Sequence, residues 1–212
     1  VLGAGNAALS AALSAQENGA KVVVIEAAPI DEAGGNSRYT AGAIRFAHDG
    51  LEDLKTVLDL TEDDIANADF GTYTSDQFYD DLFRLTQYRS DPDKSELLVT
   101  KSLETVQWMK SRGVKFQPSY GRQAFKVDGK FRFWGGLCVE TWGGGEGLIE
   151  LETKAAKENG IDILYETRGV SLLYDDQKVT GIRVKHAGEL RDINVKSVVL
   201  ASGGFEANTE MR

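Results

Sequence analysis

Hydrophobic and polar positions along the first 46 residues predict a strand, a tight turn, a helix and a second strand. The turn is glycine-rich at residues 1–8, an Ala-rich helix is expected at residues 6–18 with Gly19 as its stop, and the apolar run 22–25 leads into Glu26. This order is typical of the start of a dinucleotide-binding unit. Only two residues precede Gly3, fewer than the roughly five of an ordinary strand, so we expect further chain on the N-terminal side.

The pattern of hydrophobic and polar positions divides the rest of the chain into two parts. Residues 47–134 show helical periodicity at 75–88 and 93–112, and a hairpin is predicted with strands 124–127 and 130–133. Residues 135–212 return to mixed elements: a helix at 148–159, a strand at 161–165, an antiparallel meander of runs 170–174, 179–186 and 190–195, and a buried-type strand at 198–201.

The predicted fold class is therefore α/β. We expect a Rossmann-like domain with a parallel sheet and an antiparallel β-meander, interrupted by an inserted helical segment. The predicted parts are residues 1–46, the first part of the nucleotide-binding domain, then the acidic insert 47–134, and then the continuation of the domain at 135–212.

The charge and the cysteine content limit which partners and which cellular compartment are expected. The net charge of −9 argues against nucleic acid, and the acidic excess gathers in residues 49–104, where a solvated helical face is favoured over an acidic docking surface. A single Cys rules out an intrachain disulfide and fits a reducing, cytoplasmic compartment, and with two His it argues against a metal cluster. We expect no membrane span, because no apolar run reaches about 18 residues.

Two segments carry candidate chemistry. Gly3 permits a tight turn, Gly5 lets the backbone approach a pyrophosphate, and Glu26 can accept the hydroxyls of an adenosine ribose. The alternative is an ordinary tight turn between a strand and a helix. The polar, glycine-bounded segment 34–42 suits a backbone packed against a flat ring, with a plain connecting loop as its alternative.

These segments together resemble a known family. The glycine turn, Glu26, the residues 35–37 leading to 41–42, the glycines 143–145 and the closing run 198–205 are similar to the flavoprotein group of fumarate reductases and succinate dehydrogenases. Within this group, residues 34–37, 112–118 and 160–167 resemble the tricarballylate dehydrogenase branch most.

The resemblance implies FAD and assigns residues to it. The pyrophosphate is implied to contact Gly3, Gly5, Asn6 and Ala7, and the ribose Glu26. The isoalloxazine is implied to contact Asn36, Ser37, Thr40, Ala41 and Gly42, and the adenine edge Val170. Ala201, Ser202 and Gly203 match the segment that closes over the cofactor. For Val170, simple core packing is the alternative.

The resemblance also implies the reaction. Succinate dehydrogenases carry a flavin-bound His where this chain has Asn36, so noncovalent FAD is expected. The implied activity is hydride transfer between flavin N5 and a polycarboxylate substrate, with an electron-transfer partner possible. The alternatives are a 3-ketosteroid-type dehydrogenase and a nucleotide-binding fragment without activity of its own. The family's catalytic Arg and His follow the closing segment, so they are expected beyond Arg212 and no catalytic residue is assigned.

Seven further side chains are weaker candidates. The guanidinium groups of Arg38 and Arg45 can bind a carboxylate, although exposed arginines are favoured. The indoles of Trp134 and Trp142 can form an aromatic wall or pack in a core. The remaining three are interpreted as a buried small hydrophobe, Cys138, and as structural or exposed histidines, His48 and His186.

Overall fold

The computed structural model describes residues 1–206 and 208–212. Contacts divide the chain into two compact units, a first unit of residues 1–40 and 145–212 and a second unit of residues 41–144. The division at 1–46, 47–134 and 135–212 stays a prediction. Within the described residues, no helix combines the length and the apolar character needed to cross a bilayer.

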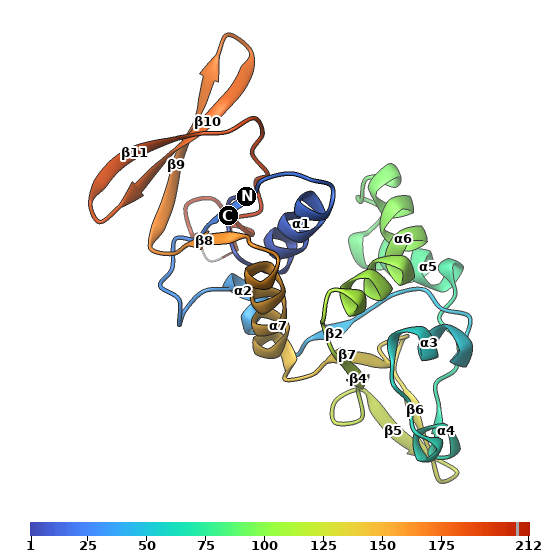
Figure 1. The fold of residues 1–212 in the computed structure, drawn as a ribbon. Coiled ribbons are helices and arrows are strands. Elements are labelled where there is room, and N and C mark those ends of the chain that lie inside the picture. Colours follow the sequence, from blue (N-terminus) through green and yellow to red (C-terminus); the bar gives the residue numbers. More distant parts are fainter. Residues whose placement is uncertain (207) are drawn as a thin grey trace. The chain divides into compact units, whose positions relative to one another are not determined.

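A small parallel arrangement of strands organises the first unit (Figure 1). Strand β1 (Val23–Ile25) pairs in parallel with β8 (Asp162–Leu164). Leu2 forms parallel bridges to both Ile25 and Leu200, and its carbonyl accepts the N–H of Ala201 at 2.9 Å. The segments that begin and nearly end the chain are therefore hydrogen-bonded to each other beside β1.

Helix α1 (Asn6–Glu17) confirms the predicted Ala-rich helix. Its buried residues share one face, on which small side chains allow close packing: Ala8, Leu9, Ala12 and Leu13. The helix ends before Gly19, whose φ of +84° is the left-handed conformation expected of a glycine stop.

Helix α7 (Gly144–Glu158) begins four residues before the predicted start at 148. The glycine run expected to precede the helix forms its first turn instead. A Cβ at Gly145 would lie 2.2 Å from the carbonyl oxygen of Ser37, so this turn packs closer to its neighbour than any side chain allows.

The antiparallel meander is confirmed. It consists of β9 (Thr167–Asp175), β10 (Lys178–His186) and β11 (Glu189–Asn194) in the order β11, β10, β9. The buried side chains of Ile182 and Val184 pack with Ile25, which joins the meander to the parallel strands.

Two expectations for the first unit were wrong. The polar segment after Gly34 contains a one-turn helix, α2 (Gly35–Arg38), rather than only a loop. The predicted buried strand at 198–201 contributes only the bridge at Leu200, which is 63% exposed, because this segment is the last member on its side of the parallel arrangement.

The second unit is mixed helix and strand. Its helices are α3 (Leu51–Val57), α4 (Glu62–Asn67), α5 (Ser75–Thr86) and α6 (Pro92–Ser111). The last two confirm the predicted helices, and each starts at a capping side chain, Thr74 for α5 and Asp91 for α6. The shorter α3 and α4 were not predicted.

Two three-stranded sheets complete the second unit. One has the order β2 (Ala43–Ile44), β7 (Val139–Thr141), β4 (Phe116–Pro118), and the other β3 (Ala68–Asp69), β6 (Lys130–Phe133), β5 (Ala124–Val127). Strands β5 and β6 are the predicted hairpin. The core of this unit is built on the fully buried side chains of Phe46, Leu54 and Val139.

Candidate functional site

A groove of about 760 Å³ lies beside the glycine turn, entirely within the first unit. Its size falls within the range of small-molecule sites. Four segments that are distant in sequence form it. They are residues 2–7, residues 25–27, residues 34–37, and residues 200–204 together with Glu206.

Two glycines in the turn are closely packed, and Gly3 leaves no room for a side chain. Gly3 has a φ of +103°, and a Cβ there would lie 2.3 Å from the carbonyl oxygen of Ala201. At Gly5, a Cβ would lie 3.3 Å from the carbonyl oxygen of Gly34 and 3.4 Å from the hydroxyl of Ser37. The turn therefore brings the backbone of three segments to the groove without an intervening side chain.

The N-terminus of α1 opens into this groove. Its N-cap residue, Gly5, has no side chain to accept the first amide N–H groups of the helix. The Asn6 N–H donates to Ser37 Oγ at 3.2 Å, which ties α2 to the start of α1. The groove wall thus carries the positive end of a twelve-residue helix, a favourable place for an anion.

Charged side chains in the groove are acidic. Among the described residues that line it there is no Lys or Arg, and the charged ones are Glu26 and Glu206. A phosphate bound here must be held by backbone N–H groups and the helix dipole rather than by a cationic side chain.

Glu26 is fixed in the groove by two backbone donors. Its Oε2 accepts the Ala4 N–H and its Oε1 accepts the Ala28 N–H, both at 2.8 Å. These bonds connect the end of β1 to the glycine turn. Each carboxylate oxygen keeps a further lone pair that can accept a hydroxyl of a ligand.

Ten of the fourteen residues assigned to FAD line this groove. These are Gly3, Gly5, Asn6, Ala7, Glu26, Asn36, Ser37, Ala201, Ser202 and Gly203. The turn, the carboxylate, the Asn36–Ser37 pair and the closing segment therefore share one cavity. The sequence prediction had not included Ala4, whose N–H holds Glu26, or Gly34, which packs on Gly5.

The other four assigned residues lie elsewhere. Thr40 bonds within its own loop, with its Oγ1 donating to the Ser37 carbonyl at 3.0 Å. Ala41 and Gly42 belong to the second unit. Val170 is 53% exposed and sits at a β-bulge, since Gly169 and Ser171 pair with consecutive residues of β10. Core packing as the alternative for Val170 is therefore wrong.

Both candidate carboxylate-binding arginines are engaged inside their own units. Arg38 pairs with Glu146 at 2.7 Å. Arg45 pairs with Asp81 at 2.8 Å and donates to the Tyr73 hydroxyl at 2.9 Å. Neither lines the groove, and each guanidinium already has a carboxylate partner.

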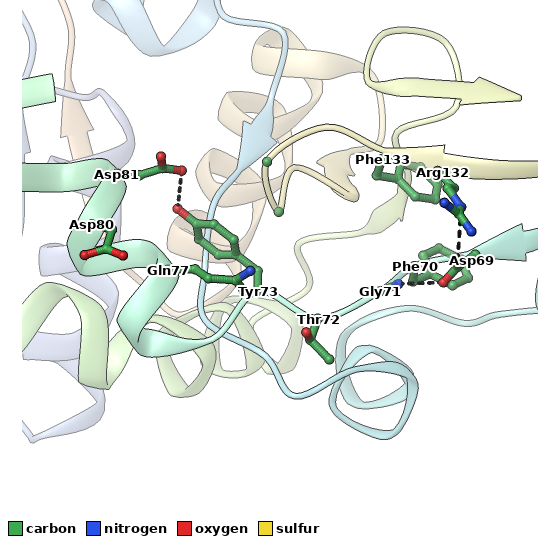
Figure 2. A pocket seen from close by; sticks show the side chains of 12 residues that line it. Asp69, Phe70, Gly71, Thr72, Tyr73, Gln77, Asp80, Asp81, Arg132 and Phe133 are labelled. Carbon is green, nitrogen blue, oxygen red and sulfur yellow. Dashed lines mark hydrogen bonds and ion pairs between the residues drawn. The ribbon is translucent and has the colours of Figure 1, made fainter. Parts of the chain in front are cut away.

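A second hollow, of about 550 Å³, lies within the second unit (Figure 2). At one end the Tyr73 hydroxyl donates to Asp81 at 3.0 Å, and at the other Arg132 pairs with Asp69 at 3.2 Å. A Cβ at Gly136 would lie 2.2 Å from the Tyr73 ring, so the ring is packed tightly in place. Burial raises the pKa of Tyr73, which keeps its hydroxyl protonated.

The remaining candidates are structural. Cys138 is a buried small hydrophobe, as predicted: its Sγ lies 3.6 Å from Nε2 of the buried His48, and burial raises the pKa of the thiol to about 12. His186 ends β10, as expected, with Nδ1 3.1 Å from the Thr167 hydroxyl. The two tryptophans, Trp134 and Trp142, are 63% and 58% exposed, so the interpretation that they pack in a core was wrong.

Parallel strands joined by a glycine turn, a helix that starts at the groove and a carboxylate at the end of β1 define a Rossmann-type dinucleotide-binding domain. The family described as "FAD binding domain" matches residues 1–212. The chain belongs to this family, and FAD is its cofactor.

Individual relatives agree with this assignment. A probable fumarate reductase of Shewanella frigidimarina is 33% identical over 100% of this chain and 33% of its own length. A urocanate reductase of Eggerthella lenta is 28% identical over 100% of the chain and 32% of its own. The open conformation of a flavocytochrome c3 fumarate reductase matches 99% of the chain and 34% of its own, with 30% identity and a TM-score of 0.72. The chain thus spans about a third of the length of these relatives.

Proposed function

We propose that the chain serves an FAD-dependent oxidoreductase that interconverts a carbon–carbon single and double bond in a polycarboxylate. Bound FAD supplies the redox chemistry, because its N5 atom accepts or delivers hydride. The observation that carries the proposal is the groove in which the glycine turn, Glu26 and the Asn36–Ser37 pair meet.

Each segment of the groove has a proposed task. The turn at Gly3 and Gly5 and the first N–H groups of α1 bind the pyrophosphate, and Glu26 accepts the ribose hydroxyls. The isoalloxazine is proposed to contact Asn36, Ser37, Thr40, Ala41 and Gly42. The adenine edge is proposed to contact Val170, and Ala201, Ser202 and Gly203 are proposed to close over the cofactor. Asn36 offers no imidazole to the ring, which supports noncovalent FAD.

The substrate class is proposed from the relatives. One relative is named for fumarate and another for urocanate, and both molecules contain a double bond conjugated with a carboxylate. We extend this to a polycarboxylate such as tricarballylate, with an electron-transfer partner and a cytoplasmic location. The catalytic residues are not assigned.

The first experiment asks whether the protein holds flavin. The purified protein is expected to show flavin absorbance and to release the pigment into the supernatant on acid precipitation, because no covalent bond retains it. Pigment that stays with the precipitate would contradict noncovalent binding. Absence of flavin together with tight NADH binding would overturn the flavin assignment.

The second experiment tests the substrate. The flavin is reduced chemically without oxygen, and its reoxidation is followed after addition of fumarate, aconitate, urocanate or a 3-ketosteroid. Reoxidation by an unsaturated carboxylate supports the proposal. Reoxidation by the steroid alone favours the 3-ketosteroid alternative, and a flavin-loaded protein that responds to none supports a binding unit without activity of its own.

A further inference from the structure

A buried carboxyl group lies behind the start of α1 and is unexplained by the site described above. Glu152 on α7 is 1% exposed, and its Oε2 has no hydrogen-bond partner among the residues that the structure describes. Its Oε1 lies 3.0 Å from the hydroxyl of Ser10 on α1. An ionised carboxylate in this position would be costly, because one oxygen is buried without a protein donor among the described residues.

The Ser10 hydroxyl connects this carboxyl to the groove. Ser10 Oγ lies 3.4 Å from Oδ1 of Asn6, one turn earlier on α1, and Asn6 lines the groove. A hydroxyl has one proton to donate. Ser10 can therefore donate either to Glu152 or to Asn6, and the protonation state of Glu152 decides which.

We propose that Ser10 and Glu152 position the side-chain amide of Asn6 for the FAD pyrophosphate. The neutral Glu152 carboxyl donates to Ser10 Oγ, Ser10 donates to Asn6 Oδ1, and the two Nδ2 hydrogens of Asn6 are left for phosphate oxygens. Ionisation of Glu152 would turn the Ser10 proton away from Asn6 and would add a negative charge behind the phosphate site. This inference rests on the proposed function, because it places the pyrophosphate at Asn6.

The surroundings of Glu152 favour the neutral form. Burial raises the pKa of this carboxyl to about 8, and the Ser10 hydrogen bond opposes the shift only in part. Charged side chains on the surrounding elements do not contribute to this pKa shift. Arg38 of α2 is paired with Glu146. The other charged side chains on α1 and α7 are Glu17, Glu150, Lys154, Lys157 and Glu158.

The test measures FAD affinity of the apo-protein across pH. Wild type, Ser10→Ala, Glu152→Gln and the control Ser14→Ala are titrated with FAD, by quenching of flavin fluorescence, between about pH 6 and pH 9. Ser14 is exposed on the same helix one turn further on, so its loss changes helix composition without touching the groove.

Wild-type affinity is expected to fall about 5- to 10-fold as the pH rises through the titration of Glu152. Glu152→Gln keeps a donor toward Ser10 at every pH, so it should bind as wild type does at low pH and remain constant. Ser10→Ala should bind about 5- to 10-fold more weakly at low pH and keep only the smaller pH dependence that comes from the charge of Glu152, while Ser14→Ala follows wild type.

Two results would overturn the inference: wild-type affinity for Ser10→Ala at low pH, or a Glu152→Gln profile that falls with pH as wild type does. If Ser10→Ala does not fold by circular dichroism, the Glu152→Gln profile decides alone. A wild-type protein that binds no FAD at any pH would instead overturn the proposed function.

Discussion

Two regions of the first unit each place a glutamate against the start of α1, in opposite surroundings. At the end of β1, the half-buried Glu26 accepts two backbone N–H groups, one for each oxygen. Between α1 and α7, the buried Glu152 has one hydroxyl neighbour and one oxygen without a partner in the described part of the chain. The first region supplies a donor to each carboxylate oxygen, whereas the second buries an oxygen without a donor among the described residues.

The difference teaches what each carboxyl can do. A carboxylate held by N–H donors is a fixed acceptor, suited to ribose hydroxyls. A buried carboxyl that stays protonated is a donor, suited to directing a hydroxyl. The same residue type therefore has different chemistry on the two sides of one helix.

The largest effect is expected from Glu26→Arg. The change removes the acceptor of the Ala4 and Ala28 N–H groups and puts a cation where ribose hydroxyls need an acceptor. FAD retention should be abolished, and the free energy of unfolding should fall by about 2–5 kcal/mol, since two hydrogen bonds to a charged group are lost.

Flavin absorbance after gel filtration measures retention, and urea denaturation measures stability. Glu26→Gln is the matched control, because its carbonyl oxygen keeps one acceptor and should give an intermediate loss. Unchanged retention in Glu26→Arg would remove Glu26 from the site.

Gly3→Ala should distort the glycine turn, in which the Ala4 N–H donates to Glu26. The new methyl group would lie 2.3 Å from the Ala201 carbonyl oxygen at a φ of +103°, so the turn must shift. We expect a loss of about 2–5 kcal/mol in unfolding free energy and weaker FAD binding. Gly19→Ala is the control: it has a φ of +84° and no atom within 4 Å of a new Cβ, so it separates backbone strain from the clash. Equal losses in the two variants would contradict a specific contact with Ala201.

Glu152→Gln tests the comparison of the two glutamates through the pH dependence of the free energy of unfolding. The pKa of Glu152 is about 8 in the folded protein against an ordinary value of 4.5. The folded state thus holds a proton that the unfolded chain has released, and the free energy of unfolding falls as the pH rises between these values. The contribution is complete below the lower value and lost above the upper one.

Glu152→Gln removes this dependence, so the variant should be more stable than wild type at neutral pH, by at most about 3 kcal/mol. The amide inherits the position without a partner, which makes the actual gain smaller. Urea denaturation of the apo-proteins at about pH 5, 7 and 9 measures it. A constant difference between wild type and variant across this range would show that Glu152 is ionised in the folded state.

The two carboxyl groups also differ in how far the sequence predicts them. Glu26 was predicted because the turn, the helix and the second strand are adjacent in the chain, so spacing alone places the carboxylate near Gly3. Glu152 faces Ser10 across 142 residues of sequence, and its burial depends on how α7 packs on α1. Helical periodicity at residues 148–159 gives no signal that this carboxyl is directed inward.

The same distinction holds for the fold. The meander, the hairpin and the long helices follow from local patterns and were predicted, although α7 begins four residues and β9 three residues earlier than expected. The one-turn helix α2 was not, because its first residue is a glycine and its stability comes from contacts such as Asn6 N–H to Ser37 Oγ. Exposure was also misjudged where a neighbouring strand decides it, as at Leu200.

Glu146→Gln should have the smallest effect and sets the baseline for the comparison. Glu146 lies six residues before Glu152 on α7, but its side chain is 60% exposed and forms an ion pair with Arg38. Exposed pairs of this kind contribute about 0–1 kcal/mol, so stability should change by less than about 1 kcal/mol, and FAD affinity by less than about 2-fold at every pH. Denaturation and FAD titration measure both, with Glu150→Gln as the control for an α7 carboxylate outside that ion pair. If Glu146→Gln altered the pH profile of FAD binding as strongly as Glu152→Gln, the charge of α7 would act on the groove through its overall field. The hydrogen bonds from Glu152 through Ser10 to Asn6 would then not be the cause of the pH dependence of FAD binding.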